Sequence, residues 1–154
     1  MAGGSIRHAQ VEDREALVAM RMLLWPESSP EEQRAELDAC LKGGPAGSLP
    51  AMILVAQEAD GTLIGFLEVG LRSHADGCDT AQPVGYVEGW FVREGFRRKG
   101  IGGELMRAAE DWARRLGCRE IASDALVGNL PSQEAHQALG FLEVDRCVHF
   151  RKAL

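Results

Sequence analysis

The strongest constraint on the fold comes from residues 84–116, where a nearly apolar stretch runs into a helical pattern through a short glycine-rich turn. Residues 84–92 read VGYVEGWFV, which predicts a strand. After the turn, apolar residues recur at helical spacing, at Ile101, Leu105, Ala108, Trp112 and Leu116. Gly117 suits the position just past the end of that helix. A strand, a turn and a helix therefore follow one another with no spacer.

The residues before this unit predict a short strand, two helices and a hairpin. The short strand is centred on Ile6, and Asp13 is a suitable N-cap for the first helix, which ends before Pro26. Ser29 begins the second helix, and Glu32 completes a capping box. Two partly alternating apolar runs, 52–58 and 63–72, then flank an Asp-Gly pair, which is typical of a β-hairpin.

The residues after this unit predict a strand over 119–125, a short helix between Asn129 and Gly140, and a final strand over 141–152. The predicted order is β-α-α-β-β-β-α-β-α-β, an α/β (α+β) arrangement around a mixed sheet. No repeat or linker interrupts it, so we expect a single domain over 1–154.

Composition and charge argue against several classes of protein. The 154 residues carry a formal net charge of −6, which disfavours a nucleic-acid partner and suits a cationic one. The start of the chain has no apolar signal region, and no apolar run is long enough for a membrane span. The four cysteines show no CxxC spacing, so we expect no metal site and reduced thiols in a cytoplasmic protein.

The turn itself concentrates positive charge where a helix begins. Arg97, Arg98 and Lys99 precede Gly100, Gly102 and Gly103. A helix N-terminus attracts anions, and glycines let the backbone approach a phosphate closely. The turn matches neither a nucleotide P-loop nor a dinucleotide fingerprint. A solvated turn is the alternative, but its position between an apolar strand and an amphipathic helix favours a phosphate site.

The motifs together resemble a known family. RRKGIGG, preceded by VEGWFV, is similar to the acyl-CoA pyrophosphate loop of the GNAT superfamily of N-acetyltransferases, whose Q/R-x-x-G-x-G/A pattern falls on Arg97, Gly100 and Gly102. The later N-x-x-S and HQALGF resemble its second coenzyme motif. The segments LLWP, GCD, VEGWFV, GCREIASD and HQALGF fall in the order typical of the aminoglycoside 6'-N-acetyltransferases. The resemblance covers nearly the whole chain.

The resemblance implies a GNAT-like acyl-CoA N-acyltransferase fold and acetyl-CoA as co-substrate. It also implies acetylation of the 6'-amine of aminoglycosides, by direct amine attack in a ternary complex, and a homodimer. The expected coenzyme contacts are Trp90, Phe91, Val92, Arg97, Arg98, Lys99, Gly100, Ile101, Gly102, Gly103, Asn129 and Ser132. Helix capping explains Asn129 equally well.

Glu88 is the candidate general base because it is the only carboxylate in its apolar strand. The neighbouring Gly89 permits a β-bulge, which would re-aim side chains. An ordinary surface glutamate is the alternative. The resemblance adds a substrate-binding role for Glu88 and suggests that the amides of Trp90 and Val92 hold the pantetheine arm.

Four further residues are candidates for substrate binding. Asp124 follows a strand, where a turn role is equally plausible, and the resemblance assigns it to the aminoglycoside. Asp145 matches a further acidic position in the last strand. Asp79 could add negative potential, although a solvated loop explains it. Trp25 is ordinarily read as a core residue, but the resemblance places it beside the substrate.

His136 is the second catalytic candidate. It stands where many members of the superfamily have a tyrosine that is proposed to protonate the leaving thiolate. A packed or solvated histidine is the alternative, and a coenzyme thiol leaves without much help.

Two other functions remain open. The acceptor could be a polyamine, a small metabolite amine or a protein amine, or the chain could be a non-catalytic acyl-CoA-binding module. The loop SHADGCD lacks the aromatic that is common in this branch, and the last predicted strand has His149-Phe150-Arg151-Lys152 where the branch often has Phe-Tyr-Arg-Lys. These departures affect the expected substrate spectrum.

Overall fold

The computed structural model describes residues 4–45 and 47–154. Its elements are β1 (Ser5–His8), η1 (Val11–Asp13), α1 (Arg14–Leu24), α2 (Pro30–Leu41), β2 (Ala51–Gln57), β3 (Leu63–Arg72), β4 (Val84–Val92), η2 (Glu94–Phe96), α3 (Ile101–Arg115), β5 (Ile121–Ser123) and α4 (Leu130–Ala138). Within the described ranges, no helix is long and apolar enough to cross a membrane.

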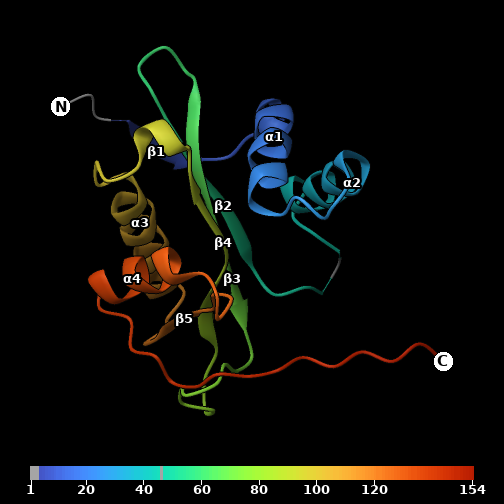
Figure 1. Ribbon diagram of the computed structural model, residues 1–154, viewed down its shortest axis with the longest axis vertical. Coiled ribbons are helices and arrows are strands. Elements are labelled where there is room, and N and C mark those ends of the chain that lie inside the picture. The colour runs from blue at the N-terminus through green and yellow to red at the C-terminus, as the bar shows by residue number, and fades with distance from the viewer. Residues whose placement is uncertain (1–3, 46) are drawn as a thin grey trace.

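The five strands form one sheet in the order β1-β2-β3-β4-β5. The first four strands pair antiparallel, and β5 joins β4 in parallel. Helices α1 and α2 cover one face of the sheet, and α3 and α4 lie on the other (Figure 1). The predicted mixed sheet with four helices is therefore confirmed.

Two hydrophobic clusters hold the layers together. On the α3 face, Leu105, Met106 and Trp112 pack against the apolar side chains of the sheet. On the other face, Leu17, Met20 and Leu37 from α1 and α2 pack against the sheet around Phe66. Burial of such side chains contributes about 1.5–3 kcal/mol each.

Local signals set the helix boundaries as expected. The Ser29 hydroxyl accepts from the Glu32 amide, and the Glu32 carboxylate accepts from the Ser29 amide, which completes the capping box. Gly117, with φ 87°, follows α3 and its C-cap residue Leu116. Asp13 precedes α1 but does not cap it, because its carboxylate accepts from Arg7 at 2.7 and 2.9 Å. That pairing lowers the pKa of Asp13.

The predicted final strand over 141–152 is wrong for this structure. Residues 141–154 form neither helix nor strand, and the segment runs away from the body to the C-terminus (Figure 1). A strand requires hydrogen bonds to a neighbouring strand as well as an alternating sequence. Among the described residues, this segment has no strand partner.

Candidate functional site

The centre of the candidate site is a β-bulge in β4. Glu68 of β3 lies opposite Gly89, whereas the next residue, Val69, lies opposite Val87. Glu88 is therefore left without an opposite residue. Such a bulge re-aims side chains and interrupts the ladder of hydrogen bonds. The expectation of a bulge at Glu88 and Gly89 is confirmed.

Trp25, the residue after α1, packs directly on this bulge. A Cβ added to Gly89 would lie 2.8 Å from the indole Cη2 atom, so the contact requires glycine. The indole also meets the Phe66 ring edge-on, with 6.4 Å between ring centroids. The structure thus brings Trp25 to the bulge that carries Glu88, as its predicted role at the substrate site requires.

A chain of four polar side chains runs from the bulge to the end of β5. Arg72 donates to both carboxylate oxygens of Glu88, at 2.9 and 2.8 Å. Its guanidinium carbon lies 3.5 Å from the centroid of the Tyr86 ring. The Tyr86 hydroxyl donates to Asp124 at 2.7 Å. Glu88 and Asp124, two predicted substrate-binding residues, therefore belong to one network.

Two pKa shifts describe this network. Burial raises the pKa of Tyr86, and the hydrogen bond to Asp124 raises it further. The hydrogen bond to Glu88 raises the pKa of Arg72. Tyr86 therefore remains a protonated donor and Arg72 remains a cation at neutral pH.

Sequence reasoning missed Arg72 and Tyr86. Tyr86 is the only tyrosine in the chain and stands two residues before Glu88, so the alternation of a strand places both on one face. That signal was available. Arg72 had no such signal, because its contact with Glu88 depends on the register between β3 and β4.

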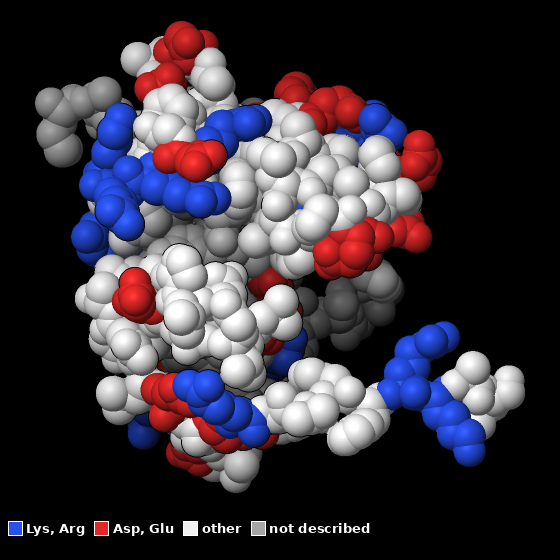
Figure 2. Space-filling view, in the orientation of Figure 1, with Lys and Arg blue, Asp and Glu red and all other residues white. Residues whose placement is uncertain are grey.

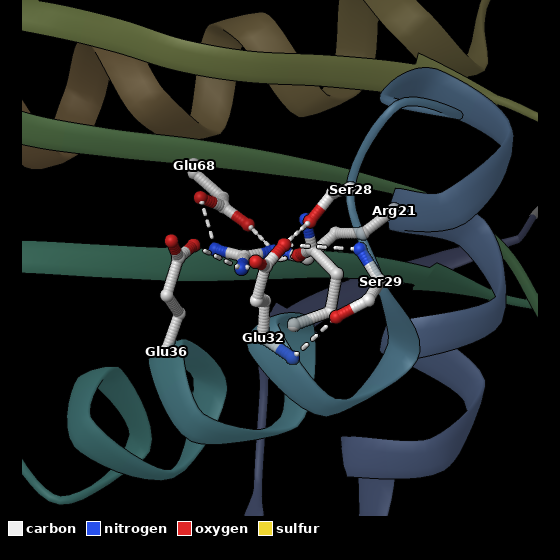
Figure 3. A network of polar contacts seen from close by, with 7 residues as sticks. Arg21, Ser28, Ser29, Glu32, Glu36 and Glu68 are labelled. Carbon is white, nitrogen blue, oxygen red and sulfur yellow. Dashed lines mark hydrogen bonds and ion pairs between the residues drawn. The ribbon is translucent and has the colours of Figure 1, made fainter.

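A second, buried ion pair lies beneath the bulge. Arg21 of α1 donates to both oxygens of Glu68, at 2.6 and 2.7 Å, and also to Gln33 at 2.8 Å. Glu36 accepts from the same guanidinium at 3.2 Å (Figure 3). Glu68 is a lone carboxylate in an apolar strand, the same signal that drew attention to Glu88. This pair ties α1 and α2 to the strand position opposite Gly89.

The glycine turn opens α3 with two residues in the left-handed region. Arg98 has φ 61° and Gly100, the N-cap, has φ 85°. Arg97, Arg98 and Lys99 are exposed, and Figure 2 shows Lys and Arg side chains gathered over this segment. The first amides of a helix have no intrahelical acceptors, so this end is a suitable anion site.

The three glycines of the turn serve different purposes. Gly100 supplies the positive φ. A Cβ on Gly102 would lie 3.2 Å from the Trp90 indole, and the indole N–H donates to the Gly102 carbonyl at 3.2 Å. A Cβ on Gly103 would lie 3.4 Å from the Arg107 guanidinium. Gly102 therefore allows β4 to pack against the start of α3, a reason beyond phosphate binding.

The predicted coenzyme contacts divide into exposed cations and core residues. The side chains of Phe91 and Ile101 are buried in the two hydrophobic clusters. Only their backbone atoms are therefore available to a ligand. The Arg97 side chain donates to the Val92 carbonyl at 2.8 Å, which anchors the turn to the end of β4.

The strands β4 and β5 separate beside the bulge. They pair only from Gly85 to Val87, opposite Ile121 to Ser123. Among the described strands, residues 88–92 have no neighbour on the β5 side. Their backbone groups on that side have no strand partner among the described residues, and the coenzyme contact of the Trp90 and Val92 amides stays a prediction. Asn129 caps α4 by accepting from the Ser132 amide at 3.2 Å, which confirms its expected capping position.

His136 lies where β4 and β5 separate. Its Nδ1 atom is 2.7 Å from the Ser132 carbonyl oxygen, so Nδ1 carries a proton and donates it. Its Nε2 atom is 2.8 Å from the Ser123 hydroxyl. The ring also meets the Trp90 indole edge-on at 5.1 Å. Both nitrogens have partners, which supports a packing role, and the role of general acid stays a prediction.

The remaining acids lie outside the four-residue network. The Asp79 carboxylate accepts from the amide of Ala81 at 2.9 Å within its own loop. Asp145 lies in the exposed C-terminal segment. Their substrate roles stay predictions. Among the described residues, no group of His, Cys, Asp and Glu is placed to hold a metal ion.

Comparisons with known proteins agree with this geometry. A model of the acetyltransferase (GNAT) family matches residues 14–141. The aminoglycoside N(6')-acetyltransferase type 1 of Klebsiella aerogenes is 40% identical over 149 residues, which cover 97% of this chain and 96% of that protein. The protein of the same name from Serratia marcescens is 39% identical over 144 residues, which cover 93% of this chain and 94% of the relative.

Solved structures show the same fold. AAC(6')-Iy in complex with the bisubstrate analog CoA-S-monomethyl-acetylneamine has a TM-score of 0.86 and 34% identity, over 97% of this chain and 98% of that chain. Apo AAC(6')-IG from Acinetobacter haemolyticus has a TM-score of 0.86 and 33% identity, over 97% and 99%. The predicted GNAT-like fold is therefore confirmed.

Proposed function

We propose that this chain, which belongs to the acetyltransferase (GNAT) family, transfers the acetyl group of acetyl-CoA to the 6'-amine of aminoglycosides and thereby confers resistance to them. The observation that supports this most is that the strand presenting Glu88 leads, through the short η2, into the glycine turn that opens α3. An acid for the amine and an anion site for the co-substrate thus share one strand–turn–helix unit. Relatives with aminoglycoside acetyltransferase names cover nearly the whole chain.

The residues of the turn suit the diphosphate of acetyl-CoA. The Glu104 amide begins the helical ladder by donating to the Gly100 carbonyl, so the amides of Ile101, Gly102 and Gly103 precede that ladder. Helix-dipole stabilisation adds about 0.3–1 kcal/mol for an exposed anion. The exposed side chains of Arg98 and Lys99 add positive charge. The co-substrate supplies a thioester, whose acetyl carbonyl the outward amides of Trp90 and Val92 would polarise.

Glu88 acts on the acceptor amine in this mechanism. Its carboxylate removes a proton from the ammonium, directly or through one water, so that the nitrogen has a free electron pair. The nitrogen then bonds to the acetyl carbon and the carbon–sulfur bond breaks. The second proton that the nitrogen loses passes to the departing sulfur, directly or through water, and the sulfur leaves as the coenzyme thiol. Positioning of the reactants supplies roughly 7–11 kcal/mol, and proton removal adds a factor of about 10²–10⁴.

The acids around Glu88 suit a substrate with several ammonium groups. Asp124 is held by Tyr86 in the same network, and Glu36 of α2 is a further acid, bound to Arg21. The net charge of −6 favours the approach of a polycation. A second ammonium would therefore find an acid while the first contacts Glu88.

Thiol release from acetyl-CoA with a panel of acceptors tests this function. We expect release with aminoglycosides that carry a 6'-amine and none with matched 6'-hydroxyl compounds. Release only with polyamines or peptides would indicate a different acceptor. Tight coenzyme binding without turnover on any acceptor would indicate a non-catalytic binding module. Both results would contradict the proposal.

We also propose that the protein is a homodimer. The C-terminal segment supports this, because its apolar side chains alternate at Leu142, Val144, Val148 and Phe150 and are all exposed, Phe150 at 93%. An extended segment with one apolar face requires a surface to cover it, and large exposed apolar patches mark interfaces. The edge strand β5 has only three residues, so a second copy could contribute both the covering surface and a strand partner.

Sedimentation measurements test the homodimer. We expect the full chain to sediment with twice the mass of one copy. Changing Val148 and Phe150 together to Asp should yield monomers. His149 alternates with these apolar residues and so lies on the other side of the segment; the His149→Asp variant should therefore remain dimeric. A monomeric wild-type protein at micromolar concentration would contradict this proposal.

A cytoplasmic location is part of the same proposal. The co-substrate is a metabolite of the cell interior, and all four cysteines are free in the structure, which fits a reducing compartment. Fractionation of cells that express the chain would test it, and recovery outside the cytoplasm would contradict it.

A further inference from the structure

Arg72 places a positive charge on the carboxylate that the proposed function reserves for a substrate ammonium. Its guanidinium contacts both oxygens of Glu88, at 2.9 and 2.8 Å. It also lies 3.5 Å above the Tyr86 ring, whose hydroxyl donates to Asp124. A cation of this chain thus links the two carboxylates to which substrate ammonium groups are assigned.

A substrate amine and Arg72 compete for the same carboxylate. A guanidinium that donates to both oxygens of Glu88 occupies one lone pair on each oxygen and places its positive charge where an incoming ammonium would bind. Glu88 therefore has to leave Arg72, at least in part, before it can bind and deprotonate an amine.

The contact between Arg72 and Glu88 is weak enough to exchange. Both side chains are almost half exposed, at 45% and 44%. Exposed pairs of this kind shift an equilibrium by at most about fivefold, and a half-exposed cation on an aromatic ring contributes a similar factor. The stacking on Tyr86 does not depend on Glu88, so Arg72 retains a partner when Glu88 is released.

We propose that Arg72 is a specificity-determining residue that acts as an internal counter-ion to Glu88 and is displaced by the ammonium of the acceptor. This inference rests on the proposed function. Acceptors that bring a second ammonium to Asp124 offset the loss of the Arg72 contact. Neutral acceptors gain nothing from displacing it, so Arg72 favours substrates with several positive charges.

Arg72→Met tests the inference, because methionine keeps an apolar side chain over Tyr86 and removes the charge. We expect the KM of an aminoglycoside with a 6'-amine to fall about three- to fivefold, with kcat changed less than threefold. The Kd of the same compound, measured by calorimetry without acetyl-CoA, should fall by the same factor. Arg72→Lys keeps the charge but cannot donate to both oxygens of Glu88 as a planar guanidinium does, so it should lower KM by a smaller factor.

Arg114→Met is the matched control for net charge. Arg114 makes an exposed ion pair with Asp111 on α3, on the opposite face of the sheet. Its removal changes the net charge equally and should leave KM within twofold of wild type. An equal decrease in KM for both variants would show a general charge effect and overturn the inference.

The opposite result has an equally clear meaning. If Arg72 holds Glu88 in its working position, Arg72→Met will raise KM or lower kcat more than tenfold, and the inference is wrong. Failure of the proposed function is distinguishable from this outcome, because wild-type protein would then release no thiol with any aminoglycoside.

Discussion

Two arginine–glutamate pairs each have one member on β3. These members, Glu68 and Arg72, are four residues apart, and both pairs are bidentate. Arg21 holds Glu68 at 2.6 and 2.7 Å, and Arg72 holds Glu88 at 2.9 and 2.8 Å. Their burial differs greatly: the side chains are 3% and 12% exposed in the first pair, and 45% and 44% exposed in the second.

This difference in burial separates a structural contact from an exchangeable one. Two charges removed from water depend on each other, because either one left alone would be buried without a partner. Two half-exposed charges can each be solvated, so their pairing contributes little to stability. Glu68 therefore supports the strand opposite the bulge, whereas Glu88 is available to a ligand.

The largest expected effect comes from breaking the buried pair. Arg21→Met leaves Glu68 buried without a partner and should lower the free energy of unfolding by about 3–5 kcal/mol. Arg72→Met, the matched change in the exposed pair, should lower it by about 0–1 kcal/mol. Urea denaturation of both variants gives the two values.

A double variant sharpens that result. Combining Arg21→Met with Glu68→Leu removes both charges, and it should recover most of the stability that the single change loses. Equal destabilisation by Arg21→Met and Arg72→Met would contradict the distinction between the two pairs.

The next effect concerns the packing of the bulge. Gly89→Ala adds a Cβ that would lie 2.8 Å from the Trp25 indole. Overpacking of this kind should destabilise the fold by about 1–3 kcal/mol, and the shifted bulge should reduce acetyl transfer. Gly95→Ala is the control, because a Cβ there meets nothing within 4 Å. Similar melting temperatures for the two variants would show that the bulge tolerates a side chain.

A smaller effect follows from Tyr86 at alkaline pH. Burial and then the hydrogen bond to Asp124 raise its pKa, so the folded protein retains the phenol proton at pH values where the unfolded chain loses it. This contribution to stability is complete below the pKa of the unfolded chain, about 10, and is lost as pH rises through the folded pKa.

Tyr86→Phe removes that pH dependence. Between about pH 8 and 11, which spans the unfolded pKa of tyrosine, the unfolding free energy of wild type should fall more steeply than that of the variant. Parallel curves would indicate that the phenol titrates alike in the folded and unfolded chain.

Much of the fold follows from local sequence. The capping box at Ser29, the glycine after α3 and the Asp-Gly hairpin each depend on residues close in the chain, and all three occur in the structure. The last strand did not follow, because residues 141–152 supply the alternation but not the neighbour that a strand requires. Pairing between distant segments is not encoded in the pattern of either segment alone.

The site divides in the same way. Glu88 and the glycine turn were identifiable, since a lone acid in an apolar strand and a basic glycine-rich helix start are local anomalies. Arg72 and the Arg21–Glu68 pair were not, because each contact joins two elements through a register or a packing angle. Sequence reasoning therefore found the candidate groups for the chemistry and missed the side chains that contact them.

The most direct test of the account is the pH dependence of kcat/KM for Glu88→Gln and wild type, with the same 6'-amine aminoglycoside. At pH 7 the variant should be slower by about 10²–10⁴, the contribution of a general base, while its affinity for acetyl-CoA stays unchanged. The difference should shrink as pH approaches the pKa of the substrate amine, where the nitrogen no longer needs a base. A constant ratio of the two rates across that range would contradict the role of Glu88.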